Sequence, residues 1–163
     1  GPSGHERASS VQEILPWLKL ATDMNPQFIK AYRVGYYWLY RLHMPEQARN
    51  YLFEGLHNNP GNTELLFDLG WLYQQDYHDT NRAYNVWMAG LRCWQAQSAD
   101  TKTNTEAELA YEETVMNLAH LEERQGHWRQ AIEYLQMVKK VSPNPDAIQA
   151  QIDEAKQKVM GGK

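Results

Sequence analysis

The sequence predicts an all-α chain, a solenoid of about three helix-turn-helix repeats. Small residues recur 35 positions apart along the chain: Gly35 and Gly70, Ala48 and Ala83, Gly55 and Gly90. Pro26 and Pro60 are separated by 34 positions. A third copy of the pattern carries Ala119, Ala131, Leu135, Val138 and Pro143. A period of about 34 residues, with a small residue of one helix opposite an alanine in the next, is typical of helical solenoids.

Composition limits the classes of function. The chain has 163 residues, of which 42% are hydrophobic and 12% aromatic, and this suits one domain with a packed core. Its formal net charge is -4, and the longest run of basic residues is the pair Lys139 and Lys140. Nucleic-acid binding needs a concentrated basic stripe, so we expect no nucleic-acid partner. No apolar run reaches about 18 residues, so we expect no membrane span.

The first residues, Gly1-Pro2-Ser3-Gly4, resemble the remnant of a cleaved affinity tag. We therefore expect residues 1–10 to be a tag remnant and a flexible N-terminus, and residues 11–160 to form a single domain. With such a remnant, the lack of a signal peptide or a membrane anchor in the sequence is not evidence of a compartment.

Apolar spacing predicts the helices of the first half. Val11, Ile14, Leu15, Leu18 and Ala21 indicate a half-repeat helix over 11–23, which Pro16 could kink or shorten. The following helices are expected over 27–42, 45–58, 63–75 and 81–95, with Pro45 opening the second of these. In the helix over 27–42, the stripe expected to pack on its neighbour is Ala31, Val34, Gly35 and Trp38.

The period breaks in the second half, where about 14 residues are inserted. Residues 96–105 are rich in Ser, Asp, Thr and Asn and predict a loop, either a tolerated surface insertion or a partner contact. Thr105 and Glu108 have the spacing of a capping box at the start of a helix over 105–124. Gly126 suits a helix end. Further helices are expected over 128–141 and 146–159, the last one polar enough to close a solenoid.

These marks resemble the tetratricopeptide repeat (TPR) family over residues 11–160. The first repeat has Ala31, Gly35, Trp38, Ala48, Leu52, Gly55 and Pro60. The second has Leu66, Leu69, Gly70, Tyr73, Ala83, Trp87 and Gly90, and the third has Leu118, Ala119, Ala131, Leu135, Val138 and Pro143. The resemblance implies a right-handed solenoid. Two departures are an extra residue in the turn of each of the first two repeats and the missing proline after the second.

A narrower resemblance is to bacterial repeat proteins of poorly defined role. Leu15-Pro16-Trp17-Leu18, Asn25-Pro26-Gln27-Phe28 and Phe67-Asp68-Leu69-Gly70 carry it. Many such proteins have an N-terminal membrane anchor, so this resemblance implies a repeat domain in the periplasm. A cytoplasmic location is the alternative.

The resemblance also implies a concave groove lined by the first helix of each repeat. The expected groove residues are Ile29, Arg33, Tyr36, Tyr40, Glu64, Asp68, Trp71, Gln75, Glu113, Asn117, His120 and Arg124. Tyr36 and Trp71 are the best candidates, because large amphipathic side chains dominate binding energy; packing between repeats is the alternative. Asp68 opposes a carboxylate ligand, and Glu64, Asp68 and Glu113 together favour a ligand with some basic character or a mixed surface.

No pattern of catalytic or metal-binding residues is present. The six histidines lack His-x-x-x-His spacing, Cys93 is the only cysteine, and we expect Glu122 and Glu123 on a solvated face. We therefore expect no enzyme activity, metal or cofactor. The predicted function is a protein–protein interaction scaffold or adaptor that binds a peptide or protein partner. The alternatives are a self-assembling homo-oligomer and a binder of glycans or small ligands through groove aromatics.

Overall fold

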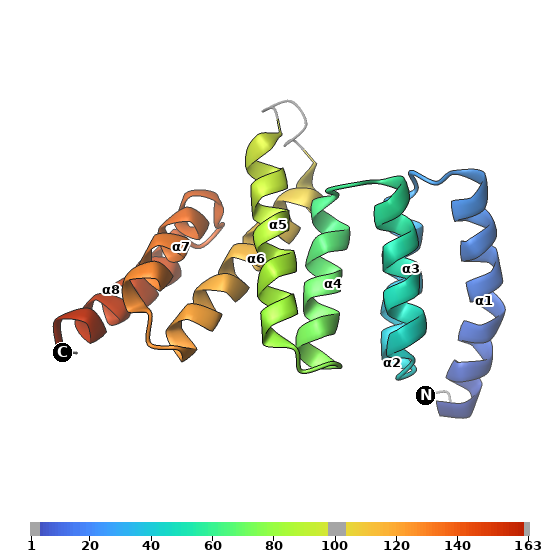
Figure 1. Ribbon diagram of the computed structural model, residues 1–163, viewed down its shortest axis with the longest axis horizontal. Helices are drawn as coiled ribbons and strands as arrows, with labels where there is room; N and C mark the ends of the chain where they lie inside the picture. Colours follow the sequence, from blue (N-terminus) through green and yellow to red (C-terminus); the bar gives the residue numbers. More distant parts are fainter. Residues whose placement is uncertain (1–3, 98–103, 162–163) are drawn as a thin grey trace. The chain divides into compact units, whose positions relative to one another are not determined.

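The computed structural model describes residues 4–97 and 104–161, with side chains from residue 12 onward, and this part of the chain is helical throughout (Figure 1). The all-α prediction is confirmed. The helices are α1 (Gly4–Met24), α2 (Ile29–Arg41), α3 (Pro45–Asn58), α4 (Thr63–Gln75), α5 (Thr80–Ala96), α6 (Thr105–Arg124), α7 (Trp128–Val141) and α8 (Pro145–Gly161). Most of the expected loop over 96–105 lies outside the described residues.

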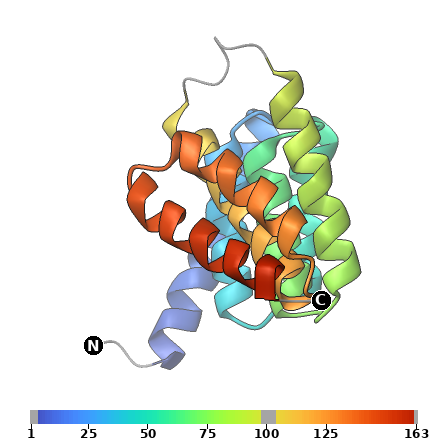
Figure 2. The same ribbon diagram turned by 90° about the vertical axis from the view of Figure 1, so that its left-hand side faces the viewer.

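Packing divides the chain into two compact units, Gly1–Ala83 and Tyr84–Lys163, with the boundary inside α5. The sequence predicts one domain over 11–160. In the first unit α1 packs on α2, and α2, α3 and α4 pack on one another. In the second unit α7 packs on α6 and on α8 (Figure 2).

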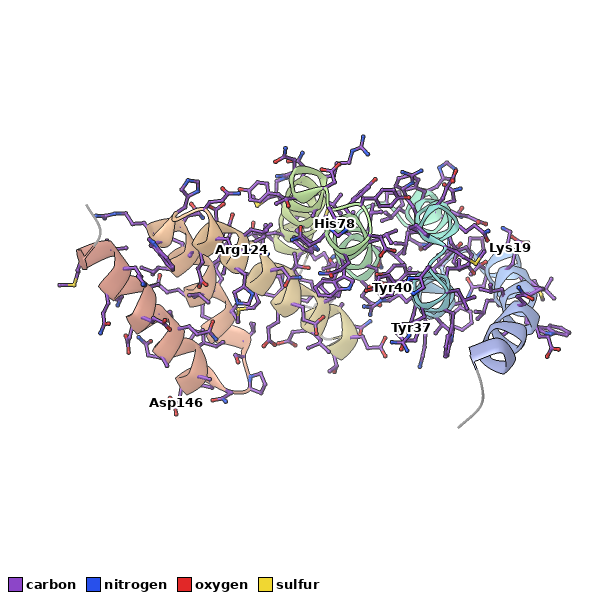
Figure 3. The ribbon with its side chains drawn as sticks, turned by 90° about the horizontal axis from the view of Figure 1, so that it is seen from below. Lys19, Tyr37, Tyr40, His78, Arg124 and Asp146 are labelled. Atoms are coloured by element: carbon purple, nitrogen blue, oxygen red, sulfur yellow. The ribbon has the colours of Figure 1, made fainter. Side chains whose placement is uncertain are left out.

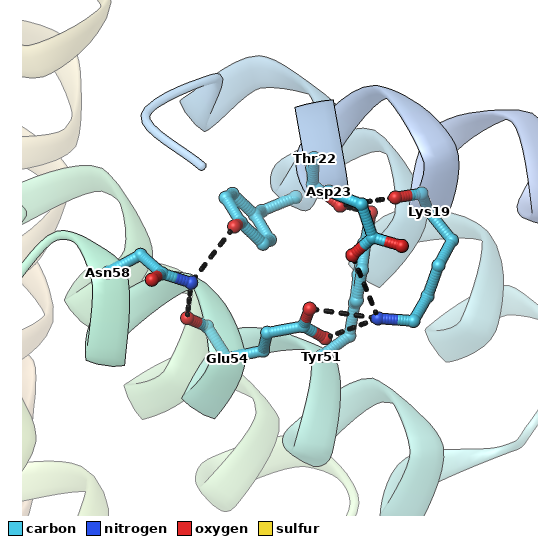
Figure 4. A network of polar contacts seen from close by, with 7 residues as sticks. Lys19, Thr22, Asp23, Tyr51, Glu54 and Asn58 are labelled. Carbon is cyan, nitrogen blue, oxygen red and sulfur yellow. Dashed lines mark hydrogen bonds and ion pairs between the residues drawn. The ribbon is translucent and has the colours of Figure 1, made fainter. Parts of the chain in front are cut away.

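The N-terminal helix is longer than the sequence predicts. Residues 5–10 were expected to be loose, but α1 begins at Gly4 and passes through Pro16. One side of α1 is anchored on α3: Thr22 is buried and lies 3.3 Å from the Tyr51 hydroxyl, and Lys19 donates to Glu54 at 2.8 Å (Figure 4).

Two asparagines start helices where the sequence predicts starts. The Asn62 side chain accepts from the backbone N–H of Leu65 at the start of α4. At the start of α6 the cap is Asn104, which accepts from the backbone N–H groups of Glu106 and Ala107. The expected capping box on Thr105 is therefore wrong by one residue; Asn is as strong an N-cap as Ser or Thr.

Glycines let the first unit pack closely. A Cβ on Gly55 would lie 2.9 Å from Cγ of Tyr32 and 3.0 Å from a methyl carbon of Leu65. A Cβ on Gly35 would lie 2.8 Å from Cδ1 of Tyr51. Both glycines thus face neighbouring helices, as the repeat pattern predicts, and Ala48 and Leu52 beside them are fully buried.

The turns fix how the helix pairs correspond. After α2, Met44 N–H donates to Leu39 C=O and His43 N–H to Tyr40 C=O; after α6, His127 N–H donates to Glu122 C=O and Gly126 N–H to Glu123 C=O. Both are Schellman turns, with a positive φ of 57° at His43 and 78° at Gly126. After α4 the corresponding bond, from Asp79 N–H to Tyr73 C=O, spans one residue more.

The extra residue expected in the turns of both early repeats is therefore present only in the second. Residues 42–44 match 125–127, whereas 76–79 is longer. With the pairs aligned on these bonds, Gly35 corresponds to Leu69 and Leu118. Tyr36 then corresponds to Gly70 and Ala119, so the pairing of Gly35 with Gly70 is wrong by one residue.

Candidate functional site

The shift of one residue in α2 changes which side chains face outward. Tyr36, the leading groove candidate, is only 6% exposed, because it occupies the small-residue position of the other helix pairs. The positions in α2 that match the expected groove positions of α4 and α6 are Lys30, Val34, Tyr37 and Arg41. Lys30, Tyr37 and Arg41 are exposed and Val34 is half-buried.

Three of the expected groove residues form a buried ion-pair cluster instead. Arg33 on α2 donates to both carboxylate oxygens of Asp68 on α4, at 2.9 and 3.1 Å. Its guanidinium also lies 3.6 Å from Glu64. The Glu64 and Asp68 side chains are 6% and 7% exposed, and that of Arg33 is 26% exposed. These charges hold α2 against α4 and are largely withdrawn from solvent.

The other expected residues have mixed positions. Tyr40 is half-buried on α2 (Figure 3). Its ring lies 6.1 Å from that of Tyr36. Trp71 is half-buried and Gln75 exposed on α4. In the second unit Asn117 is half-buried, whereas His120 and Arg124 are exposed on α6.

In the first unit the exposed face of the first helices consists of Lys30, Tyr37 and Arg41 on α2 and of Trp71 and Gln75 on α4. We call this set the α2–α4 face. Tyr37, nearly half exposed, packs edge-on against Trp38 at 5.3 Å between ring centroids. Lys30 and Arg41 form no ion pair within the described part of the chain. Tyr37 was not among the predicted groove residues because the predicted register of α2 was set on Gly35; the 34 residues between Pro26 and Pro60 give the register that the structure has.

The second unit has an open hollow of about 510 Å³ beside the turn between α6 and α7. Its lining includes Trp128, Arg129 and Lys158, with Glu133 as an opposing charge. His127 also lines the hollow, and its Nδ1 lies 2.7 Å from a Glu122 carboxylate oxygen. Glu122 is buried, so its expected place on a solvated face is wrong: the Schellman turn brings His127 over it.

Several buried tyrosines keep their protons in the folded chain at high pH. Burial raises the pKa of Tyr36, with the Asp68 charge as a second cause, and burial likewise raises the pKa of Tyr51, Tyr111 and Tyr134. As pH rises above about 10, the unfolded chain releases these protons before the folded chain does. Between the tyrosine pKa of the unfolded chain and the raised pKa of the folded chain, the free energy of unfolding therefore falls with rising pH, by at most about 1.4 kcal/mol per pH unit for each such tyrosine.

An alkaline titration tests this expectation. Tyrosinate absorbance should rise in two stages, with the buried tyrosines ionising only as the circular dichroism of the helices is lost. Tyr36→Phe should remove one tyrosine from the second stage and raise the unfolding pH. Ionisation of all ten tyrosines before any loss of helix would contradict the expectation.

Comparisons with known proteins assign no family: no protein-family model and no curated protein matches this chain. Within the described residues no helix is long and apolar enough to cross a membrane. The same part of the chain holds no group of three or more His, Cys, Asp or Glu side chains placed to bind a metal ion.

Proposed function

We propose that this chain is a protein–protein interaction module of the tetratricopeptide-repeat type, a scaffold or adaptor that binds a partner segment on the α2–α4 face. The proposal rests on one observation: this face has large side chains that are not buried in the core. Tyr37 and Arg41 are exposed on α2, and Trp71 is half-buried on α4, which packs against α2. Tyr, Trp and Arg are the residue types that most often dominate binding energy at interfaces.

The charges on this face favour an acidic partner. The expectation of a ligand with basic character rested on Glu64, Asp68 and Glu113. Glu64 and Asp68 are buried against Arg33, whereas Glu113 is exposed on α6 in the second unit and is not part of the α2–α4 face. The exposed charges of the α2–α4 face are Lys30 and Arg41. Complementary charge therefore calls for a peptide with acidic residues beside an apolar or aromatic anchor.

Two finer parts of the proposal rest on the sequence resemblance. They are the right-handed solenoid of about three repeats and the bacterial, membrane-anchored setting with the domain in the periplasm.

Affinity capture by the tagged chain tests the proposed face. Tyr37→Ala and Arg41→Glu should each reduce capture of a specific partner tenfold or more, since hot-spot losses reach 2 kcal/mol. Both side chains are exposed, so helicity should be unchanged. Phe53→Ala and Arg92→Glu are matched controls at exposed sites outside this face. Equal capture by all four variants and the unmodified chain would overturn the proposal.

A further inference from the structure

One side of α1 carries an apolar stripe that is largely exposed in the described part of the chain. Ile14, Trp17, Leu20 and Met24 follow one another at steps of three, three and four, which keeps them on one face of a helix. They are 42%, 71%, 49% and 79% exposed. The side of α1 that meets the rest of the first unit is a different one and carries Thr22. We call these four residues the α1 stripe.

The area of the α1 stripe reaches the lower end of the range for a standard dimer interface. Scaled by these exposures, the side chains offer on the order of 400 Å² of apolar surface, taking roughly 200 Å² for Trp17 and roughly 150 Å² for each of the three smaller side chains. This lies within the range of the largest apolar patch on a monomer. Homodimer interfaces are about 65% apolar, so the stripe corresponds to roughly 600 Å² per partner, the lower limit of the standard size.

The charges near the α1 stripe allow it to pack against the same stripe of a second copy of the chain. A strongly charged face would repel an identical face, but the nearby cation, Lys19, is turned toward α3. There it pairs with Glu54 at 2.8 Å and lies 3.5 Å from Asp23 (Figure 4). Among residues 12–24, where the side chains of α1 are described, Glu13 is the one charge that helical periodicity places on the side of the stripe. An antiparallel pair separates the two Glu13 carboxylates, whereas a parallel pair would place them together.

The stripe also has a self-complementary register. Residue 19 is the midpoint between Ile14 and Met24, and a two-fold axis there sets residue i of one helix opposite residue 38 − i of the other. Ile14 then faces Met24 of the second copy, and Trp17 faces Ala21, a large side chain against a small one. Glu13 faces Asn25, which can donate a hydrogen bond to its carboxylate.

From the stripe, its area, its charge and its register we infer that two copies of this chain pair through their α1 helices, antiparallel about Lys19. The contact is isologous, so it closes as a dimer. It uses a surface other than the α2–α4 face, and each copy keeps that face for a partner.

Charge complementation tests both the dimer and its register, with analytical ultracentrifugation as the measurement. The unmodified chain should sediment as a monomer–dimer equilibrium. Ile14→Glu and Met24→Lys should each weaken dimerisation at least tenfold, because each buries two charges opposite apolar side chains. An equimolar mixture of the two variants should recover dimer, since Glu at position 14 of one chain then faces Lys at position 24 of the other.

Leu109→Glu and Met160→Lys are matched controls, because both side chains are exposed in the second unit, at 53% and 87%. These variants should dimerise like the unmodified chain. A chain that stays monomeric at submillimolar concentration would overturn the inference, and so would a dimer that Ile14→Glu leaves intact. If the equimolar mixture of Ile14→Glu and Met24→Lys does not recover the dimer, the antiparallel register is overturned.

Binding to neutral phosphatidylcholine vesicles tests whether the α1 stripe contacts a membrane surface instead of a second copy. A monomeric chain that binds these vesicles through Trp17, and loses binding in Trp17→Glu, would replace the dimer by a membrane surface. None of these results depends on Tyr37 or Arg41. Failure of the dimer therefore leaves the proposed partner face standing, and failure of partner capture leaves the dimer standing.

Discussion

Arg33→Met is expected to destabilise the first unit by about 3 kcal/mol, the low end of the range for breaking a buried ion pair. Arg33 holds Asp68 through two hydrogen bonds and approaches Glu64 at 3.6 Å. Both carboxylates are more than nine-tenths buried. Methionine keeps the length of the side chain but supplies no charge, so the variant must keep two acids out of water without their guanidinium. Urea denaturation measures the loss.

A matched ion pair on the surface shows whether burial causes the loss of stability in Arg33→Met. Arg82 lies 3.5 Å from Asp79, but its side chain is 63% exposed. Arg82→Met should change the free energy of unfolding by no more than about 0.5 kcal/mol. Arg33→Met combined with Asp68→Asn should recover part of the loss, with a coupling of about 1–2 kcal/mol. Equal losses in Arg33→Met and Arg82→Met would show that the buried cluster contributes nothing particular.

The helices could be predicted from the sequence where the residues that start or end a helix agree with the helical spacing of the apolar residues. The predicted ranges 45–58, 63–75, 105–124 and 128–141 coincide with α3, α4, α6 and α7. Each of these helices begins beside a proline or a capping residue, or ends beside a residue that suits a turn. The start of α1 was missed because residues 5–10 carry no apolar stripe, and polarity alone does not prevent a helix.

The candidate surface could not be predicted to the residue, for two physical reasons. Glycine was taken as the register mark, but Gly35 is a glycine because Tyr51 lies against it, not because it matches Gly70. Charge was taken as a sign of exposure, but Glu64 and Asp68 are buried by pairing with Arg33. Long-range pairing of this kind leaves no local trace in the sequence. In the second unit, Arg124 and His120 on α6 are exposed.

Gly35→Ala should destabilise the first unit although alanine is the better helix former. A Cβ at position 35 would lie 2.8 Å from Cδ1 and 3.3 Å from Cζ of Tyr51. The Tyr51 ring cannot easily move away, because it is buried, lies 5.3 Å from the Tyr32 ring and reaches Thr22 through its hydroxyl. Overpacking costs about 1–3 kcal/mol, against a gain of about 1 kcal/mol in helix propensity. We expect a net loss of up to about 2 kcal/mol in urea denaturation.

The sign should reverse when the ring is removed. In a Tyr51→Leu background the same Gly35→Ala change meets a smaller side chain, so the propensity gain should outweigh the steric cost. The two substitutions should therefore couple by 1 kcal/mol or more in a double-mutant cycle. If Gly35→Ala stabilises the chain with Tyr51 in place, α3 can shift away from α2. The contact between position 35 and Tyr51 would then not require glycine. The loss and its reversal together would establish that position 35 is set by the α2–α3 contact and not by a repeat register.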